Sequence, residues 1–193
     1  MYFDLKQVSV GLTASATRTA FSDSNGVMYL GGYLTWDDTQ VGIYKSVNGG
    51  VTWTILPSTR TWNPKCGVGD GDGNIYLYFA DNTLKRSSDG GVTWTTITKY
   101  LAGVTVGGDA IVGSPPESGS CMAFDGTAIY LAGGNWIWKS TTQGDTWTAV
   151  HQLASTPPNF ASMAASPSLL IVASKWTQCV RSFDAGVTWE VAP

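Results

Sequence analysis

Hydrophobic residues along this chain occur in short runs that are bounded by Gly, Asp, Asn, Ser and Thr. The long 3.6-residue periodicity of an amphipathic helix is not seen, and short runs with regularly spaced turn residues are typical of strands in an all-β chain. The pattern predicts four groups of four strands: Thr19–Ser22, Val27–Gly32, Ile43–Ser46 and Thr52–Leu56; Cys66–Gly69, Ile75–Phe79, Thr83–Ser87 and Thr93–Thr96; Cys121–Phe124, Ala128–Gly133, Trp136–Ser140 and Thr146–Val150; Ala161–Ala165, Leu169–Ser174, Cys179–Ser182 and Thr188–Ala192.

The second strand of each group carries a matching pair of residues, which sets the alignment of the groups. The pairs are Tyr29-Leu30, Tyr76-Leu77, Tyr130-Leu131 and Ile171-Val172. The chain is therefore a repeat of one structural unit, and a period of about forty residues indicates a propeller or an array.

An eight-residue phrase follows the third strand of each group. It spans Ser46–Trp53, Ser87–Trp94, Ser140–Trp147 and Ser182–Trp189, with spacings of 41, 53 and 42 residues between the tryptophans. We call these segments motif turns one to four and number their positions from the serine to the tryptophan. A hydroxyl, an Asx side chain and a glycine favour a tight turn, after which Thr and Trp lead into a strand. Its predicted structural residues are Ser46, Asn48, Gly50, Trp53, Ser87, Asp89, Gly91, Trp94, Ser140, Gly144, Trp147, Ser182, Asp184, Gly186 and Trp189.

The phrase S-x-D-x-G-x-T-W resembles the Asp-box, or BNR repeat, of sialidase-like β-propellers. Asp89 and Asp184 match the aspartate of that motif, whereas motif turn one has Asn48 and motif turn three has Thr142. The resemblance covers nearly the whole chain. It implies an all-β fold, a small β-propeller of four four-stranded blades with one such hairpin in each blade. It does not specify a function, because folds of this kind serve hydrolases, binding proteins and assembly factors.

The predicted domain organisation has two parts. Residues 1–15 form an N-terminal arm or closing strand, and residues 16–193 form the propeller, with blades at about 17–57, 65–98, 120–151 and 160–193. Four blades is the low end for propellers. Ring closure can come from packing of the first blade against the fourth, or from two chains that join half-rings into a larger ring.

Composition narrows the range of partners. Only 13% of residues are charged and the net charge is −3, which argues against nucleic acid or an anionic membrane as the partner. No apolar run is long enough for a transmembrane helix, and the N-terminus lacks the features of a signal peptide. The odd set of Cys66, Cys121 and Cys179 predicts buried free thiols, with one disulfide as the alternative.

The topology predicts where binding residues gather. In an antiparallel blade, the loops between strands two and three lie with the inter-blade connections on the face opposite the motif turns. All long insertions fall on this inter-blade loop face, and loops on a rigid scaffold commonly carry binding residues. Aromatic rings that stack on sugars, with polar groups beside them, suit a glycan. The predicted ligand-binding residues are Trp36, Asp37, Arg60, Trp62 and Trp176, and Asp38, Tyr100, Asp109 and Glu117 are assigned to the same rim.

A hydrolase is the alternative to such a glycan-binding module. The resemblance implies a three-arginine clamp and a tyrosine nucleophile with a glutamate partner, but Arg86 and Arg181 belong to the repeat, which leaves only Arg18 and Arg60. A different glycosidase could use Asp37 or Asp38 opposite Asp109 or Glu117. The Asp70–Asn74 segment resembles the start of a calcium loop but aligns with the first turn of the other blades, so no metal site and no cofactor are predicted.

The sequence therefore favours a non-enzymatic binding or structural module that recognises a glycan or a protein partner, such as a phage virion or tail component. A sialidase-like glycoside hydrolase and an assembly factor that docks on a larger complex are the alternatives. A homo-oligomer or membership of a larger assembly stays open, and no nucleic acid partner and no membrane insertion are expected.

Overall fold

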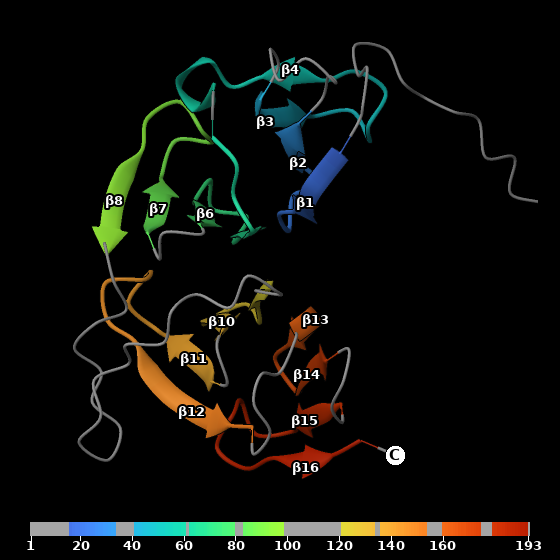
Figure 1. Cartoon of the computed structure of the whole chain (residues 1–193), viewed down its shortest axis with the longest axis vertical. Coiled ribbons are helices and arrows are strands. Elements are labelled where there is room, and N and C mark those ends of the chain that lie inside the picture. The colour runs from blue at the N-terminus through green and yellow to red at the C-terminus, as the bar shows by residue number, and fades with distance from the viewer. Residues whose placement is uncertain are drawn as a thin grey trace, which may run out of the picture.

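The computed structural model describes residues 16–33, 41–60, 62–79, 83–98, 121–133, 136–153, 160–174 and 179–192. Four four-stranded antiparallel sheets make up an all-β, four-bladed propeller, as the sequence predicts (Figure 1). Blade one contains β1 (Ala16–Ser22), β2 (Met28–Tyr33), β3 (Val41–Ser46) and β4 (Thr54–Ile55); blade two contains β5 (Cys66–Gly69), β6 (Ile75–Tyr78), β7 (Leu84–Ser87) and β8 (Thr95–Thr98); blade three contains β9 (Cys121–Phe124), β10 (Ile129–Gly133), β11 (Trp136–Ser140) and β12 (Thr148–Gln152); blade four contains β13 (Phe160–Ser166), β14 (Leu169–Ser174), β15 (Val180–Ser182) and β16 (Glu190–Val191).

The fourth strand of every blade begins later than the sequence pattern predicts. The pattern started these strands at the threonine of the motif turn, whereas β4, β8, β12 and β16 start after the tryptophan. The threonine N–H bonds within the turn, for example Thr93 N to Asp89 Oδ1 at 2.8 Å, so it is not available to the neighbouring strand. The continuous pairing of the fourth strand therefore starts after the tryptophan.

The blades follow one another around an arc. The inner strands contact in the order β1, β5, β9 and β13, and Figure 1 shows an opening between blades one and four. In the described part of the chain, no comparable contact joins β13 to β1. The expected packing of blade one against blade four is therefore not observed among these residues, and the predicted N-terminal arm, residues 1–15, lies outside them.

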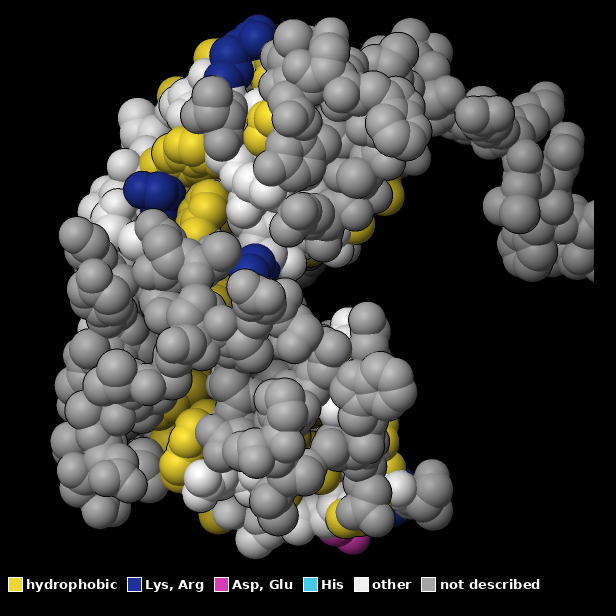
Figure 2. Space-filling view, in the orientation of Figure 1, with side chains coloured by type: hydrophobic (Ala, Val, Ile, Leu, Met, Phe, Trp, Pro, Cys, Tyr) yellow, Lys and Arg dark blue, Asp and Glu magenta, His cyan; other side chains and the backbone are white. Residues whose placement is uncertain are grey.

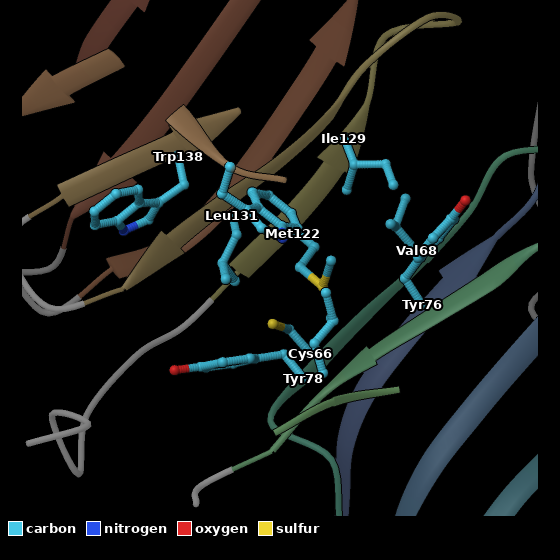
Figure 3. Packing of buried hydrophobic residues seen from close by; sticks show 10 residues of the cluster. Cys66, Val68, Tyr76, Tyr78, Met122, Ile129, Leu131 and Trp138 are labelled. Carbon is cyan, nitrogen blue, oxygen red and sulfur yellow. The ribbon is translucent and has the colours of Figure 1, made fainter. Parts of the chain in front are cut away.

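The hydrophobic core lies between the faces of successive blades. Figure 3 shows the contact of blades two and three, where Tyr76 and Val68 of one sheet meet Ile129 and Met122 of the next. Tyr76 and Leu131 are fully buried here, and Trp138 is nearly so. Blades two and three pack on both faces, and the first two strands of each, β5, β6, β9 and β10, are therefore almost continuously buried.

Two further contacts recur at all three blade-to-blade junctions. First, a cation at the end of the third strand donates to the carbonyl at position four of the next motif turn: Lys45 Nζ to Gly90 O at 3.0 Å, Arg86 Nη1 to Gln143 O at 2.8 Å, and Lys139 Nζ to Ala185 O at 2.8 Å. Position four has a left-handed backbone in every turn, including the non-glycine residues Gln143 (φ 53°) and Ala185 (φ 57°). This conformation is shared by all four turns, and its carbonyl accepts the cation at each junction.

Second, an aliphatic residue of the fourth strand or just beyond it packs on the glycine at position five of the next turn. A Cβ built on Gly91 would lie 2.4 Å from Leu56 Cδ1, one on Gly144 would lie 3.0 Å from Ile97 Cδ1, and one on Gly186 would lie 3.5 Å from Val150 Cγ2. The glycine thus permits close approach of the neighbouring blade.

No helix in the described part of the chain is both long and apolar enough to cross a membrane.

Candidate functional site

The motif turns are built on a buried serine. Each of the four serines is 1% exposed. The hydroxyl accepts the N–H of position five at 2.8–2.9 Å in all four turns (Gly50 to Ser46, Gly91 to Ser87, Gly144 to Ser140 and Gly186 to Ser182). The tryptophan Nε1 donates to the carbonyl of position five in each turn, at 2.8–3.1 Å. These bonds fix the turn and hold the indole ring across the sheet, which confirms the predicted turn.

The Asx side chain at position three completes the turn. Asp89 accepts from Thr93 Oγ1 at 2.5 Å, Thr93 N at 2.8 Å and Ser87 Oγ at 2.7 Å. These bonds, chiefly that of the Thr93 hydroxyl, lower the pKa of Asp89 to about 2. The Thr188 hydroxyl and backbone do the same for Asp184, whose pKa is also about 2. Both carboxylates are thus ionised structural groups rather than proton donors at neutral pH.

The turns between the first and second strands use three more carboxylates. Asp23 Oδ1 accepts Val27 N at 3.0 Å, Asp70 Oδ1 accepts Asp72 N at 3.0 Å, and Asp125 Oδ1 accepts Ala128 N at 2.7 Å. Asp70–Asn74 therefore forms the predicted turn. Among the residues that the structure describes, no group of three His, Cys, Asp or Glu side chains could hold a metal ion.

The inter-blade loop face lies at the opposite end of the strands. The end of each second strand, the start of each third strand and the end of each fourth strand meet there. The segments that carry Trp36, Asp37, Asp38, Tyr100, Asp109, Glu117 and Trp176 join these strand ends, but the residues themselves lie outside the described residues. Their predicted binding role stays a prediction.

Arg60 and Trp62 are the two predicted binding residues that the structure describes. Arg60 is exposed and directly follows the short helix η1 (Pro57–Thr59) that ends blade one. Trp62 is partly buried against blade two, with its ring centroid 5.3 Å from that of Trp94 and 5.7 Å from that of Phe79. Arg60 is therefore exposed to solvent, whereas Trp62 packs against Trp94 and Phe79 of blade two.

Lys85 lies beside Trp62, although the sequence pattern does not predict it as a binding residue. Its Nζ lies 5.0 Å from the centre of the Trp62 ring and donates to Thr96 Oγ1 at 2.9 Å. Strand alternation could have found it, because Arg86 contacts blade three and the preceding side chain must point to the other face of the sheet.

The described carboxylates gather away from the inter-blade loop face. Seven of them belong to turns at the motif-turn end of the blades, namely Asp23, Asp70, Asp72, Asp89, Asp125, Asp145 and Asp184. Glu190 pairs with Arg181 at 2.6 Å on β16. In the view of Figure 2, Lys and Arg side chains are visible mainly over the half formed by β1–β8, and Asp and Glu are visible only at the lower edge. A pair of catalytic carboxylates is thus not found in the described part of the inter-blade loop face.

Comparison with known proteins bears on the function. No family model matches the chain. The chain is 29% identical over 187 residues to xyloglucanase Xgh74A of Acetivibrio thermocellus, a match that covers 89% of this chain and 18% of the relative. It is 27% identical over 143 residues to a xyloglucanase of a Paenibacillus species, covering 65% of this chain and 13% of the relative. The chain therefore spans less than a fifth of the length of these two curated relatives.

Solved structures agree on the fold. The crystal structure of a GH74 enzyme of Niastella koreensis matches 93% of this chain and 30% of its own, with a TM-score of 0.65 and 23% identity. The two curated relatives are named as enzymes, which contradicts the prediction of a non-enzymatic binding or structural module and the assignment of the chain as a non-enzyme. That assignment rested on the small number of arginines in the sequence, which bears on sialidases and not on other hydrolases.

Proposed function

We propose that this chain is a propeller of a glycoside hydrolase that cleaves a neutral glucan, with xyloglucan as the first candidate. The observation that carries the proposal is the 29% identity to a protein named xyloglucanase, which extends over 89% of the chain. The sequence resemblance to Asp-box propellers is consistent with it, and we propose that the motif turns are Asp-boxes.

A neutral substrate suits the charged residues of the chain. Arg86 donates to the Gln143 carbonyl and lies 3.3 Å from Asp145, while Arg181 is paired with Glu190. Both guanidinium groups are thus engaged within the repeat. Of Arg60, Arg86 and Arg181, the arginines whose side chains the structure describes, Arg60 alone is exposed near the inter-blade loop face, which argues against recognition of a sialic acid carboxylate by an arginine cluster among them.

Hydrolysis of a glycosidic bond needs two carboxyl groups on either side of it. One donates a proton to the leaving oxygen, and the other either removes a proton from the attacking water or forms a covalent glycosyl intermediate. Asp89, Asp125 and Asp184 on the motif-turn side are held by backbone and hydroxyl donors, so they are poor candidates. We propose Asp37 or Asp38 as one partner and Asp109 or Glu117 as the other, because their segments join strand ends on the inter-blade loop face.

The same face would supply the subsites for sugar rings. We propose Trp36, Trp62 and Trp176 as stacking platforms, with Arg60 and Asp37 as hydrogen-bonding groups. Lys85 Nζ already lies over the Trp62 ring, 5.0 Å from its centre, in a cation–π contact.

The test is release of reducing ends from xyloglucan by the purified chain, with mixed-linkage β-glucan and a sialoside as comparison substrates. Asp37→Asn, Asp38→Asn, Asp109→Asn and Glu117→Gln are compared with Asp72→Asn, which changes an exposed carboxylate in a turn at the opposite end of the blade. We expect cleavage of xyloglucan, lost by at least a hundredfold in one variant of each pair and retained in Asp72→Asn. A folded chain that releases no reducing ends from any glucan would contradict the proposal.

A further inference from the structure

We propose that motif turn one is a modification site, at which the turn promotes deamidation of its own Asn48 to aspartate. Asn48 holds position three, where motif turns two and four carry Asp89 and Asp184. The next residue is Gly49, which has no side chain to hinder its main-chain nitrogen, so this nitrogen can approach the preceding side-chain amide closely. The reaction would give motif turn one the aspartate of the other two turns.

The side-chain amide of Asn48 is held as an activated acyl group. Its Oδ1 accepts Thr52 N at 2.9 Å and Ser46 Oγ at 3.0 Å. Two donors on a carbonyl oxygen stabilise the negative charge that develops there when a nucleophile adds to the carbon. Nδ2 donates to Thr52 Oγ1 at 2.9 Å, so a hydroxyl lies beside the nitrogen that has to leave. The turn therefore supplies an oxyanion site and a proton relay for the loss of ammonia.

The nucleophile is the main-chain nitrogen of Gly49. Among the described residues none accepts a hydrogen bond from it, whereas in motif turn two the corresponding Gly90 N donates to Gly73 O at 3.0 Å. Asn48 and Gly49 are both exposed, so hydroxide or a buffer base can reach the N–H. A nitrogen that is not engaged in a hydrogen bond is free to lose its proton and add to the Asn48 Cγ.

The reaction has two steps. In the first, Gly49 N gives its proton to solvent and bonds to Asn48 Cγ, while the Cγ–Nδ2 bond breaks and the amide nitrogen takes up a proton and leaves as ammonia. In the second, water adds to Cγ of the resulting succinimide, the bond from Cγ to Gly49 N breaks, and this nitrogen regains a proton. One water is consumed and one ammonia is released. Opening of the ring at the main-chain carbonyl would give isoaspartate instead, but Thr52 N and Ser46 Oγ activate the Cγ carbonyl, which favours aspartate.

The product fits the turn that makes it. In motif turn two, Asp89 accepts Thr93 N at 2.8 Å, Thr93 Oγ1 at 2.5 Å and Ser87 Oγ at 2.7 Å. The aligned N–H and hydroxyl groups of motif turn one already surround the Asn48 side chain. A carboxylate there keeps both bonds to Oδ1, and the Thr52 hydroxyl turns from acceptor to donor. Hydrogen bonds to a carboxylate are stronger than those to an amide, so the turn stabilises the product.

A second Asn-Gly pair, Asn25-Gly26, is an internal control in the same chain. Both of its residues are exposed, as in motif turn one. However, Gly26 N donates to Asp23 O at 3.1 Å, so this nitrogen is engaged. Asn25 Nδ2 donates to Gly71 O, and no donor among the described residues reaches Asn25 Oδ1. This pair has the same two residues but neither the free nitrogen nor the activated carbonyl, so it should react more slowly in the folded chain.

The experiment incubates the full chain in mildly alkaline buffer made with oxygen-labelled water and follows both asparagines by peptide mass spectrometry. An isoaspartate-specific methylation assay separates the two products. In the folded chain we expect Asn48 to deamidate about tenfold faster than Asn25, with aspartate as the main product. In denaturant the rate at Asn48 should fall to that at Asn25, and isoaspartate should predominate at both, because the turn is lost.

Two variants test the assigned groups. Thr52→Val removes only the hydroxyl beside Nδ2 at an exposed position, and it should slow the reaction at Asn48 without changing that at Asn25. Gly49→Ala should slow it further, and motif turn four accommodates alanine at this position, since Ala185 has φ 57°.

The product variant Asn48→Asp should melt at or above the temperature of the wild type. In the folded chain, equal rates at the two asparagines or a main product of isoaspartate would overturn the proposal. So would a faster reaction at Asn48 in denaturant, or an unchanged rate in folded Thr52→Val and Gly49→Ala.

Discussion

Replacing Trp147 with alanine tests whether the motif-turn tryptophans stabilise the blades. Trp147 is 8% exposed, packs with Leu131 and Trp138 at the junction of blades two and three, and donates from Nε1 to Gly144 O at 2.8 Å. A buried aromatic ring removes about 150–250 Å² from water, and at roughly 25 cal/mol per Å² this is worth about 4–6 kcal/mol as an upper limit. We therefore expect Trp147→Ala to lower the free energy of unfolding by about 3–5 kcal/mol.

The assay is urea unfolding followed by far-ultraviolet circular dichroism. Trp147→Phe keeps an aromatic ring but loses the indole N–H, so it should cost less, about 1–2 kcal/mol. Val187→Ala is the matched control in another motif turn, because Val187 is 78% exposed and its truncation should change the stability by less than about 0.5 kcal/mol. If Trp147→Ala costs no more than Val187→Ala, the tryptophans do not hold the blades and the role assigned to the motif turns is wrong.

Two further predictions concern titratable groups. The pKa of Asp89 and Asp184 is about 2 in the folded chain and near 4 in an unfolded chain, so their contribution to stability is complete above about pH 4 and is lost as the pH falls through about 2. The variant Asp89→Asn with Asp184→Asn should lose less stability over that range, since Asn48 already holds Thr52 N at 2.9 Å in motif turn one; an identical pH profile in urea unfolding would contradict this. Burial raises the pKa of the Cys66 thiol well above its usual range and that of Cys121 to about 12, while Cys179 is part exposed, so a thiol reagent should modify one cysteine in the folded chain and three in denaturant; rapid modification of all three in the folded chain would be inconsistent with the buried core.

The sequence predicts the repeat well because each blade reuses the same local chemistry. The pairs Tyr29-Leu30, Tyr76-Leu77 and Tyr130-Leu131 lie in aligned positions of β2, β6 and β10, so the sheet order could be derived from pattern alone. All three cysteines are free, as predicted, although only Cys66 and Cys121 are buried. The predicted starts of the fourth strands were wrong, because the residues Thr and Trp alone do not reveal that the threonine N–H bonds back into the turn.

The candidate site was harder to predict than the fold. Trp62 is of the residue type that stacks on sugar rings, yet it contacts Trp94 and Phe79. These contacts depend on how two blades meet, which the alternation of residues within one blade does not predict. The prediction of a non-enzymatic module was wrong for a different reason. The scarcity of arginine argues against sialidase chemistry, but it carries no information on hydrolases that bind neutral sugars.

The cation at each blade junction bonds to the main chain of the next motif turn, and Arg86 also contacts a side chain there, Asp145, at 3.3 Å. The carbonyl at position four is offered by glycine, glutamine or alanine alike, as Gly90, Gln143 and Ala185 show. This bond places little demand on the residue type at position four, whereas the glycine at position five is needed for close approach of the neighbouring blade. Gene duplication or exchange of a blade would therefore preserve the joint, and such chains can change their number of blades over evolution while the loops on the opposite face diverge.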